Sequence, residues 1–278
     1  MPIRIVTDST CDLPQAIIQQ YGISVIPFYI NAGSHSYRDG IDLSRSEFYK
    51  RLAFLQPAPT TAVPGPDVFH QAYRRLAAEG ATEILSIHMS QKLSGMVDVA
   101  REAARETAAV SVTVFDSRQL SLGMGFEVLR AAQMAAEGRS MTEILAALEV
   151  QIARTHVFAA LDTLEFLHRS GRMSFAMSAL GTLLKIKPFL KMYDGTPSAE
   201  RVRTRSGAMK RLIELLLEFA PYEKAAILHS AAAERAQELL DEVRNLVPAG
   251  EIWLEEINPV IGAHIGPGVI GFACISKA

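Results

Sequence analysis

Residues Glu83 to Ala104 read EILSIHMSQKLSGMVDVAREAA, and this stretch decides the fold class that the sequence predicts. Its first seven residues are mostly apolar and alternate, which predicts a short strand. Its last nine place Val97, Ala100 and Ala104 on one face at helical spacing, which predicts a helix. A strand, a short loop and a helix in succession are the repeating unit of α/β proteins.

The loop between this strand and this helix is a candidate anion site. Ser94 stands where a helix N-cap is expected, and Gly95 follows with no side chain to cover the N–H groups of the first turn. A helix N-terminus presents unpaired donors and a partial positive charge, which suit an anion. The stretch therefore predicts either an anion-binding helix start or an ordinary capped helix.

The first half of the chain repeats the same alternation of strands and helices. Three predicted strands end in serine-bearing loops, at Asp8-Ser9, at Ser90 to Ser94 and at Asp116-Ser117. Ligands of open parallel sheets bind outside the carboxyl ends of the strands, so these loops are expected around one mouth. We predict strands at 3–7, 23–30, 83–89 and 111–115, and helices at 13–21, 43–55, 67–79, 96–104, 120–136 and 142–154. Residues 56–66 carry four prolines and are expected to form a rigid loop with two threonines at its centre.

The second half changes to a mixed pattern. A hairpin is expected around residues 194–197, and the stretch 257–276 is interpreted as a buried loop and strand, because proline and glycine interrupt it too often for a membrane span. We predict strands at 157–161, 186–193, 199–204, 225–228, 252–257 and 269–275, and helices at 164–168, 176–184, 206–219 and 233–247. The sequence thus predicts a two-domain α/β protein. Its N-terminal domain (1–154) has a mainly parallel sheet with flanking helices, and its C-terminal α/β domain (155–278) has a mixed sheet.

Composition limits the function classes. Of 278 residues, 49% are hydrophobic and 21% charged, as in a folded soluble protein, and the net charge of −2 offers no field for nucleic acid or an acidic membrane. Cys11 and Cys274 are too few for a disulfide framework, so both are expected to be reduced and buried in a cytoplasmic protein. Arg4 and Asp8 interrupt the first apolar run, which is not typical of a signal peptide.

Several catalytic motifs are absent from the sequence. Gly123-Met124-Gly125 has no third glycine at the spacing of a dinucleotide fingerprint, and there is no Walker A loop. The seven histidines include no HExxH pattern, so we predict no metal site. A serine hydrolase stays open as an alternative, with Ser94, His264 and an acid such as Asp8 or Asp116, although no Gly-x-Ser-x-Gly elbow occurs.

A basic run from Arg201 to Arg205 alternates as a strand does, which places Arg201, Arg203 and Arg205 on one face. It is either a solvated sheet edge or a surface for a carboxylate or phosphate. His264 lies in a stretch punctuated by glycine and proline, where a histidine either binds a ligand or bonds a neighbouring carbonyl.

Taken together, six motifs resemble the DegV family over the full chain and in the family's order. They are VTDSTCDLP at 6–14, Thr61 with Pro64, Ser90 with Leu93-Ser94-Gly95, LDTL at 161–164, Gly171-Arg172, and HIGPG at 264–268. Ala62, Val63 and Met96 depart from the residues that the family usually has at these positions.

The resemblance implies a non-catalytic two-domain carrier that holds one long-chain fatty acid, with no other cofactor, and presents it to a fatty-acid kinase. It implies that Thr61 and Ser94, helped by the Gly95 N–H, bind the carboxylate, with Arg172 and His264 at the same end of the ligand. Any kinase would dock around this mouth, for which Arg201, Arg203 and Arg205 are candidates. We expect a monomer without nucleic acid and without stable membrane insertion.

Overall fold

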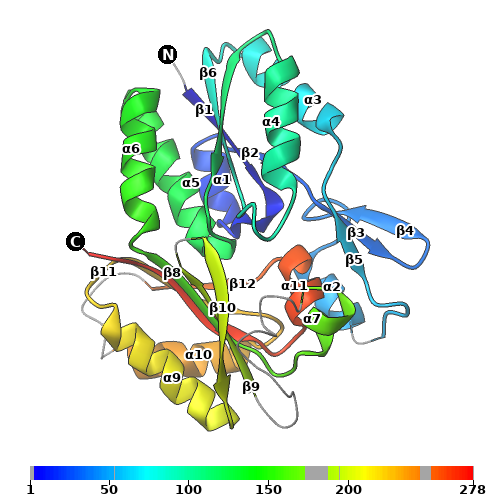
Figure 1. Cartoon of the computed structure of the whole chain (residues 1–278), viewed down its shortest axis with the longest axis vertical. Helices are drawn as coiled ribbons and strands as arrows, with labels where there is room; N and C mark the ends of the chain where they lie inside the picture. The colour runs from blue at the N-terminus through cyan, green and yellow to red at the C-terminus, as the bar shows by residue number, and fades with distance from the viewer. Residues whose placement is uncertain (1–2, 53, 173–186, 194, 245–251, 278) are drawn as a thin grey trace.

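The computed structural model describes residues 3–52, 54–172, 187–193, 195–244 and 252–277 as stacked layers of sheets and helices (Figure 1). Helix α5 (Ser121–Ala136) lies between the two larger sheets, since it contacts β1 and β6 of one and β8 and β13 of the other. This position explains why α5 is buried on nearly all sides.

The first sheet has four parallel strands in the order β2-β1-β6-β7. These are β2 (Ser24–Ile26), β1 (Ile3–Asp8), β6 (Glu83–His88) and β7 (Ser111–Asp116). Helices α3 (Pro66–Ala78) and α4 (Met96–Glu106) cover one face, and α5 covers the other with α6 (Met141–Ile152) against it. The short helix α1 (Gln15–Gln20) connects β1 and β2. Because β1, β6 and β7 are parallel neighbours, their three serine-bearing loops do meet at one edge, as predicted.

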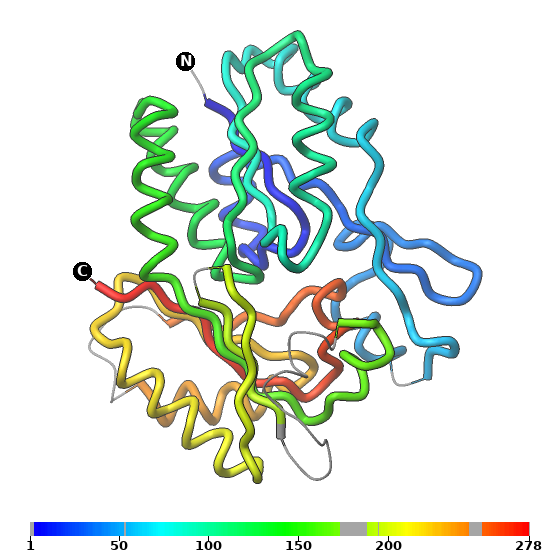
Figure 2. Tube along the Cα trace, in the orientation of Figure 1, coloured from blue at the N-terminus to red at the C-terminus, as the bar shows by residue number. Residues whose placement is uncertain are grey.

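The second sheet has six strands in the order β10-β9-β8-β13-β11-β12 and is mixed, because β11 and β12 are parallel and the other pairs antiparallel. Figure 2 shows β13 (Ile270–Ser276) running through the middle of this layer. Helices α9 (Arg205–Glu218) and α10 (Ala233–Val243) cover its outer face. The remaining strands are β8 (Thr155–Ala160), β9 (Lys187–Tyr193), β10 (Thr196–Val202), β11 (Tyr222–His229) and β12 (Ile252–Glu256).

A third, small antiparallel sheet stands beside these layers, in the order β4-β3-β5. It consists of β3 (Tyr29–Ala32), β4 (His35–Arg38) and β5 (Thr60–Ala62). Helices α2 (Arg45–Leu52), α7 (Glu165–Arg169) and α11 (Pro259–Ile265) fill the space between it and the second sheet, with α11 in contact with both other helices.

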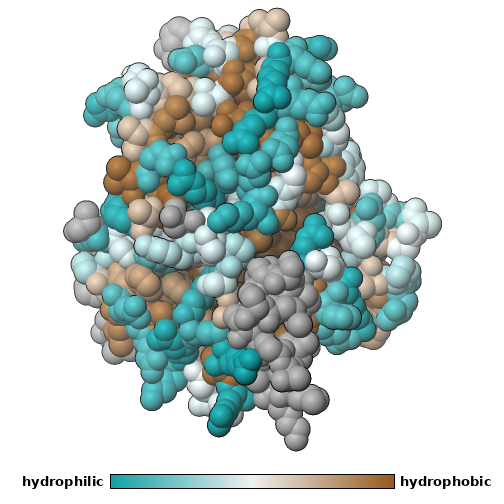
Figure 3. Space-filling model, in the orientation of Figure 1, coloured by the Kyte–Doolittle hydropathy of each residue, from teal (hydrophilic) through white to brown (hydrophobic). Residues whose placement is uncertain are grey.

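The two larger sheets lie on either side of the predicted domain boundary at Arg154, but one hydrophobic core runs across both. A second core lies under α9 and α10 on the outer face of the six-stranded sheet. Both cysteines are free and buried, as expected. Polar side chains cover much of the face in Figure 3, with apolar ones between them. None of the described helices is both long and apolar enough to cross a bilayer.

The α/β class with a parallel and a mixed sheet is confirmed, but four local predictions are wrong. The strand predicted at 23–30 is split between two sheets, because Pro27 has no N–H to continue the ladder. The proline-rich loop contains β5, and the loop expected after residue 257 begins as α11, with Asn258 as N-cap and Pro259 in its first turn.

The fourth error concerns the three arginines. Strand β10 ends at Val202 and α9 begins at Arg205, so Arg201, Arg203 and Arg205 do not share one strand face. Thr204 caps α9 by accepting a hydrogen bond from the Gly207 N–H at 2.9 Å, and this capping ends the extended segment. The helix predicted at 176–184 falls outside the described residues.

Candidate functional site

A cavity of about 180 Å³ lies between the six-stranded sheet, α11 and the loops at the mouth of the parallel sheet. A single water needs roughly 10–15 Å³ by the same measure, so this space is large enough for an organic ligand. Its lining is mostly apolar, with side chains from several elements. They include Val157 and Ala159 of β8, Leu190 and Met192 of β9, and Leu228 of β11.

All five predicted ligand-binding residues line this one cavity, namely Thr61, Ser94, Gly95, Arg172 and His264. They come from strand β5, from the loop before α4, from the end of α7 and from α11. The predicted docking arginines Arg201, Arg203 and Arg205 are exposed and are not part of the lining. The cavity therefore combines an apolar body with a small set of hydrogen-bonding groups, as small-molecule sites generally do.

Thr61 and His264 form the best-defined polar pair in the cavity. Thr61 Oγ1 and His264 Nε2 share a hydrogen bond of 2.9 Å across 203 positions of sequence. Burial, together with the nearby positive charge of Arg172, lowers the pKa of His264 to about 4. The imidazole is therefore neutral at pH 7 and carries one proton to donate.

Ser94 and Gly95 form the start of α4. The structure makes Gly95 the N-cap, one residue later than predicted, and Ser94 Oγ accepts a hydrogen bond from the Met96 N–H at 3.3 Å. Because this hydroxyl accepts within the turn, its own hydrogen remains available to donate. Gly95 is exposed, and a Cβ there would meet no atom within 4 Å, so the backbone at the helix start is open to a ligand.

Arg172 follows α7 and is exposed at the rim of the cavity. Its guanidinium donates to the Ser170 carbonyl at 3.2 Å. Phe166 of α7 packs so closely on Gly266 that a Cβ there would come within 2.2 Å of its ring, and Gly266 has a φ of 78°. The glycine is thus required where α7 meets the end of the helix that carries His264.

The hydrolase alternative is not supported. His264 bonds Thr61, and Ser94 and His264 share no hydrogen bond in the part of the chain that the structure describes. An acid–imidazole–hydroxyl chain does exist elsewhere, since His88 lies 3.0 Å from Asp8 and 2.7 Å from Ser86. All three residues are completely buried, so no substrate can reach the serine.

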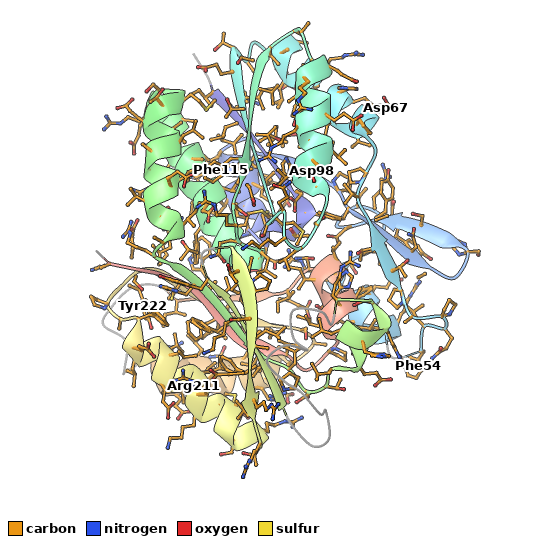
Figure 4. The ribbon with its side chains drawn as sticks, in the orientation of Figure 1. Phe54, Asp67, Asp98, Phe115, Arg211 and Tyr222 are labelled. Atoms are coloured by element: carbon orange, nitrogen blue, oxygen red, sulfur yellow. The ribbon has the colours of Figure 1, made fainter. Side chains whose placement is uncertain are left out.

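The surroundings of the three docking arginines are those of a charged sheet edge. β10 is the edge strand of its sheet, and Arg205 pairs with Asp162 at 2.9 Å. Arg211 of α9, labelled in Figure 4, pairs with Glu200 of β10 at 2.9 Å. Charged groups at an edge deter pairing with another strand, so this function remains an alternative to docking.

Among the described residues, no three histidine, cysteine, aspartate or glutamate side chains are grouped so that they could hold a metal ion. The sequence did not indicate the apolar lining of the cavity, and it did not indicate the buried hydrogen bonds that join Asp8 to His88 and His88 to Ser86. Asp8, the last residue of β1, is expected from the sequence only as a residue of the mouth and as a possible catalytic acid. His88 looks like an ordinary strand residue.

Of the three departures from the family pattern, Val63 lines the cavity and Met96 is completely buried in the core. Val63 therefore adds an apolar side chain to the cavity lining. Met96 influences the site only through its packing in the core.

Comparison with known proteins assigns the chain to a family. Residues 2–277 match the family model described as an uncharacterised protein of the DegV family. A DegV domain-containing protein of Streptomyces coelicolor is 37% identical over an alignment of 280 positions, which covers 99% of each chain. A DegV family protein from Thermus thermophilus, described for its fatty acid binding, has a solved structure with a TM-score of 0.91 and 37% identity over 100% of both chains. DegV from Bacillus subtilis, described as a fatty acid binding protein, has a TM-score of 0.92 and 31% identity over 100% of both chains. The chain belongs to the DegV family.

Proposed function

We propose that this protein binds one long-chain fatty acid, with the carboxylate at the polar end of the cavity and the acyl chain along its apolar body. The observation that carries the proposal is the gathering of Thr61, Ser94, Gly95, Arg172 and His264 on one cavity whose lining is otherwise mostly apolar. The fatty acid binding described for the Thermus thermophilus and Bacillus subtilis relatives supports it.

The polar end offers donors rather than acceptors to a carboxylate. With Nε2 protonated, His264 donates to Thr61 Oγ1, and the threonine hydroxyl then donates to the ligand. The Ser94 hydroxyl and the Gly95 N–H add two donors at a helix start, and Arg172 adds a positive charge at the rim. The acyl chain contributes about 0.8 kcal/mol for each methylene that leaves water.

Extraction of the purified protein with organic solvent, followed by mass spectrometry, tests this function. We expect near-stoichiometric fatty acid, because a long chain buried at this energy per methylene survives purification. An extract without fatty acid, combined with no uptake of added oleate by the delipidated protein, would contradict it. Hydrolysis of fatty-acid esters by the same preparation would instead favour an enzyme.

Ser94→Ala separates ligand binding from helix capping. Loss of a hydrogen bond to a charged group costs about 1.5–3 kcal/mol, whereas loss of a cap costs about 1 kcal/mol. We expect oleate affinity to fall more than the free energy of unfolding does. An unchanged affinity with a lower thermal midpoint would show that Ser94 only caps α4.

We further propose that the protein is a non-catalytic carrier that presents its fatty acid to a kinase. The sequence contains no ATP-binding motif that we recognise, so activation of the carboxylate needs a second protein. The exposed Arg201 and Arg203 could attract that partner electrostatically. Arg203→Ala should leave oleate affinity unchanged and slow acyl phosphate formation by a cognate kinase.

The difference between Arg203→Ala and the wild type should shrink as salt is raised, because salt screens the wild-type attraction. Lys210→Ala, which removes an exposed charge further along α9, is the matched control. Weaker oleate binding by Arg203→Ala would place the arginine in the ligand site, and equal kinase rates would make it a solvated edge residue.

A further inference from the structure

Asp12 is a buried carboxylate that joins the two halves of the protein. Its side chain is fully buried and forms an ion pair of 3.1 Å with Arg45 of α2. It also accepts a hydrogen bond of 2.6 Å from the Ser121 hydroxyl, at the start of α5. Asp12 and Ser121 both have left-handed backbones, with φ of 54° and 51°, and Ser121 lines the cavity. Two hydrogen-bonded residues that both adopt this uncommon conformation must be held in it by the surrounding structure.

The same carboxylate binds the start of α11. The backbone N–H of Asn258 donates to Asp12 Oδ1 at 2.9 Å, and the Asn258 amide nitrogen lies 3.1 Å from both carboxylate oxygens. The remaining amide oxygen of Asn258 accepts from the Ile261 N–H at 2.9 Å, which caps α11. Asn258 is thus an N-cap whose orientation is fixed by Asp12.

Two side chains of α2 hold the residues just before this cap. Arg45 donates to the Glu256 carbonyl, and Tyr49 donates to the Ile257 carbonyl at 2.9 Å. Tyr49 also lies directly under α11, since a Cβ on Gly262 would come within 2.4 Å of its hydroxyl. Every one of these contacts restrains the beginning of a short helix.

Helix α11 carries His264 only six positions after Asn258, and His264 bonds Thr61 at the polar end of the cavity. A donor set contributes more to affinity when it is held in place before the ligand arrives, because ordering it on binding costs free energy. In this site, Asp12 fixes Asn258, Asn258 caps α11, and α11 holds His264 in place before the ligand binds.

We propose that Asp12 is a positioning residue for the carboxylate site, acting through Asn258 and α11 on His264. This inference rests on the proposed function, because it concerns the same site. Asp12 itself does not line the cavity, so any effect on affinity has to pass through the residues that it holds.

Asp12→Asn is the first test, because asparagine keeps the size and tolerates the left-handed backbone. It replaces one acceptor oxygen by a donor that faces Ser121 or Asn258. Oleate affinity is measured by titration calorimetry for wild type, Asp12→Asn, His264→Ala and the double variant. We expect Asp12→Asn to bind about tenfold more weakly in the wild-type background and within about twofold of its parent in the His264→Ala background.

Asn258→Ser is the second test and does not depend on the folding of the first variant. Serine keeps an N-cap for α11 but removes the amide that donates to Asp12. Its oleate affinity should fall by about as much as that of Asp12→Asn. Ser140→Ala, which removes the cap of the remote helix α6, is the control for loss of stability alone and should leave affinity unchanged.

The outcomes distinguish the two proposals. A wild-type protein that binds no oleate contradicts the proposed function itself. A wild type that binds, with Asp12→Asn effects that are equal in both backgrounds, shows that Asp12 does not act through His264 and overturns the inference. Wild-type affinity in Asn258→Ser overturns it as well, whether or not Asp12→Asn folds.

Discussion

The two faces of the six-stranded sheet are built by the same strands and are packed in opposite ways. The outer face, under α9 and α10, carries Phe158, Phe189 and Phe272 in one aromatic cluster, with rings of neighbouring pairs 4.9 to 6.3 Å apart. The inner face presents Ala159 and Gly271 at the adjacent positions of β8 and β13. Successive strand residues point to opposite faces, so this large–small alternation puts bulk on one side and space on the other.

The difference shows how one sheet can be both scaffold and binding wall. The inner face also carries larger apolar side chains, such as Val157 of β8 and Met192 of β9. Protein interiors are close-packed, so the space left at Ala159 either collapses or holds something else. Here α5, α11 and the neighbouring loops keep the inner face apart from the parallel sheet, and the cavity lies between them. The outer face should therefore control stability, and the inner face should control ligand size.

Phe272→Ala should have the largest effect, and on stability alone. Phe272 is fully buried in the outer cluster and does not line the cavity. Truncation of a buried phenylalanine typically costs about 3–5 kcal/mol of unfolding free energy. Urea unfolding measures this loss, and calorimetry at low temperature should find the wild-type oleate affinity in the folded fraction. Weakened binding would mean that the two faces are not independent.

Ala159→Phe should have the opposite result. The new ring enters the cavity instead of a packed core, so we expect about a hundredfold loss of oleate affinity, while the unfolding free energy changes by less than about 1.5 kcal/mol. Uptake of a fluorescent fatty acid reports binding, and urea unfolding reports stability. Retained tight binding would place the acyl chain elsewhere.

The polar end of the site was predictable from sequence, whereas the inner face was not. Ser94-Gly95 lies between a recognisable strand and a recognisable helix, so its chemistry follows from local pattern. Ala159 and Gly271 face each other across strands that are 112 positions apart, and no local pattern distinguishes a cavity wall from a core. The space between two sheets is a property of the assembled fold.

The errors in the predicted strands and helices have local causes that are present in the sequence. Pro27 marks where one strand ends and another begins, and Asn258-Pro259 is a typical helix start that the nearby glycines concealed. The Asp12–Asn258 contact could not be foreseen, because it joins residues 246 positions apart.

The pH dependence of stability in His156→Phe tests the packing of the outer face. His156 stacks on Phe219 at 3.9 Å and on Tyr193 at 5.2 Å, and burial lowers its pKa to about 4. The folded state binds fewer protons than the unfolded state between pH 6.5 and 4, so stability present above pH 6.5 is lost as the pH falls to 4. As the pH falls from 7.5 to 5, the free energy of unfolding of His156→Phe should decrease by about 1–2 kcal/mol less than that of the wild type. Urea unfolding at each pH measures both. If the free energy of unfolding fell equally with pH in both proteins, the titration of His156 would not cause the loss of stability in acid.

The smallest effect is expected from Ala159→Val, which probes how closely the inner face fits its ligand. Valine adds two methyl groups to the cavity wall, so only ligands that reach this part of the wall should lose contact with it. Each methylene that is kept out of the cavity costs about 0.8 kcal/mol, or roughly fourfold in affinity. Competition between fatty acids of graded length, measured by mass spectrometry of the bound pool, should therefore shift toward shorter chains. Leu217→Val, an exposed position on α9, is the matched control and should leave the bound pool unchanged. A bound pool that does not change in Ala159→Val would mean that the acyl chain ends before β8, and the inner face would then be a wall that the ligand does not touch.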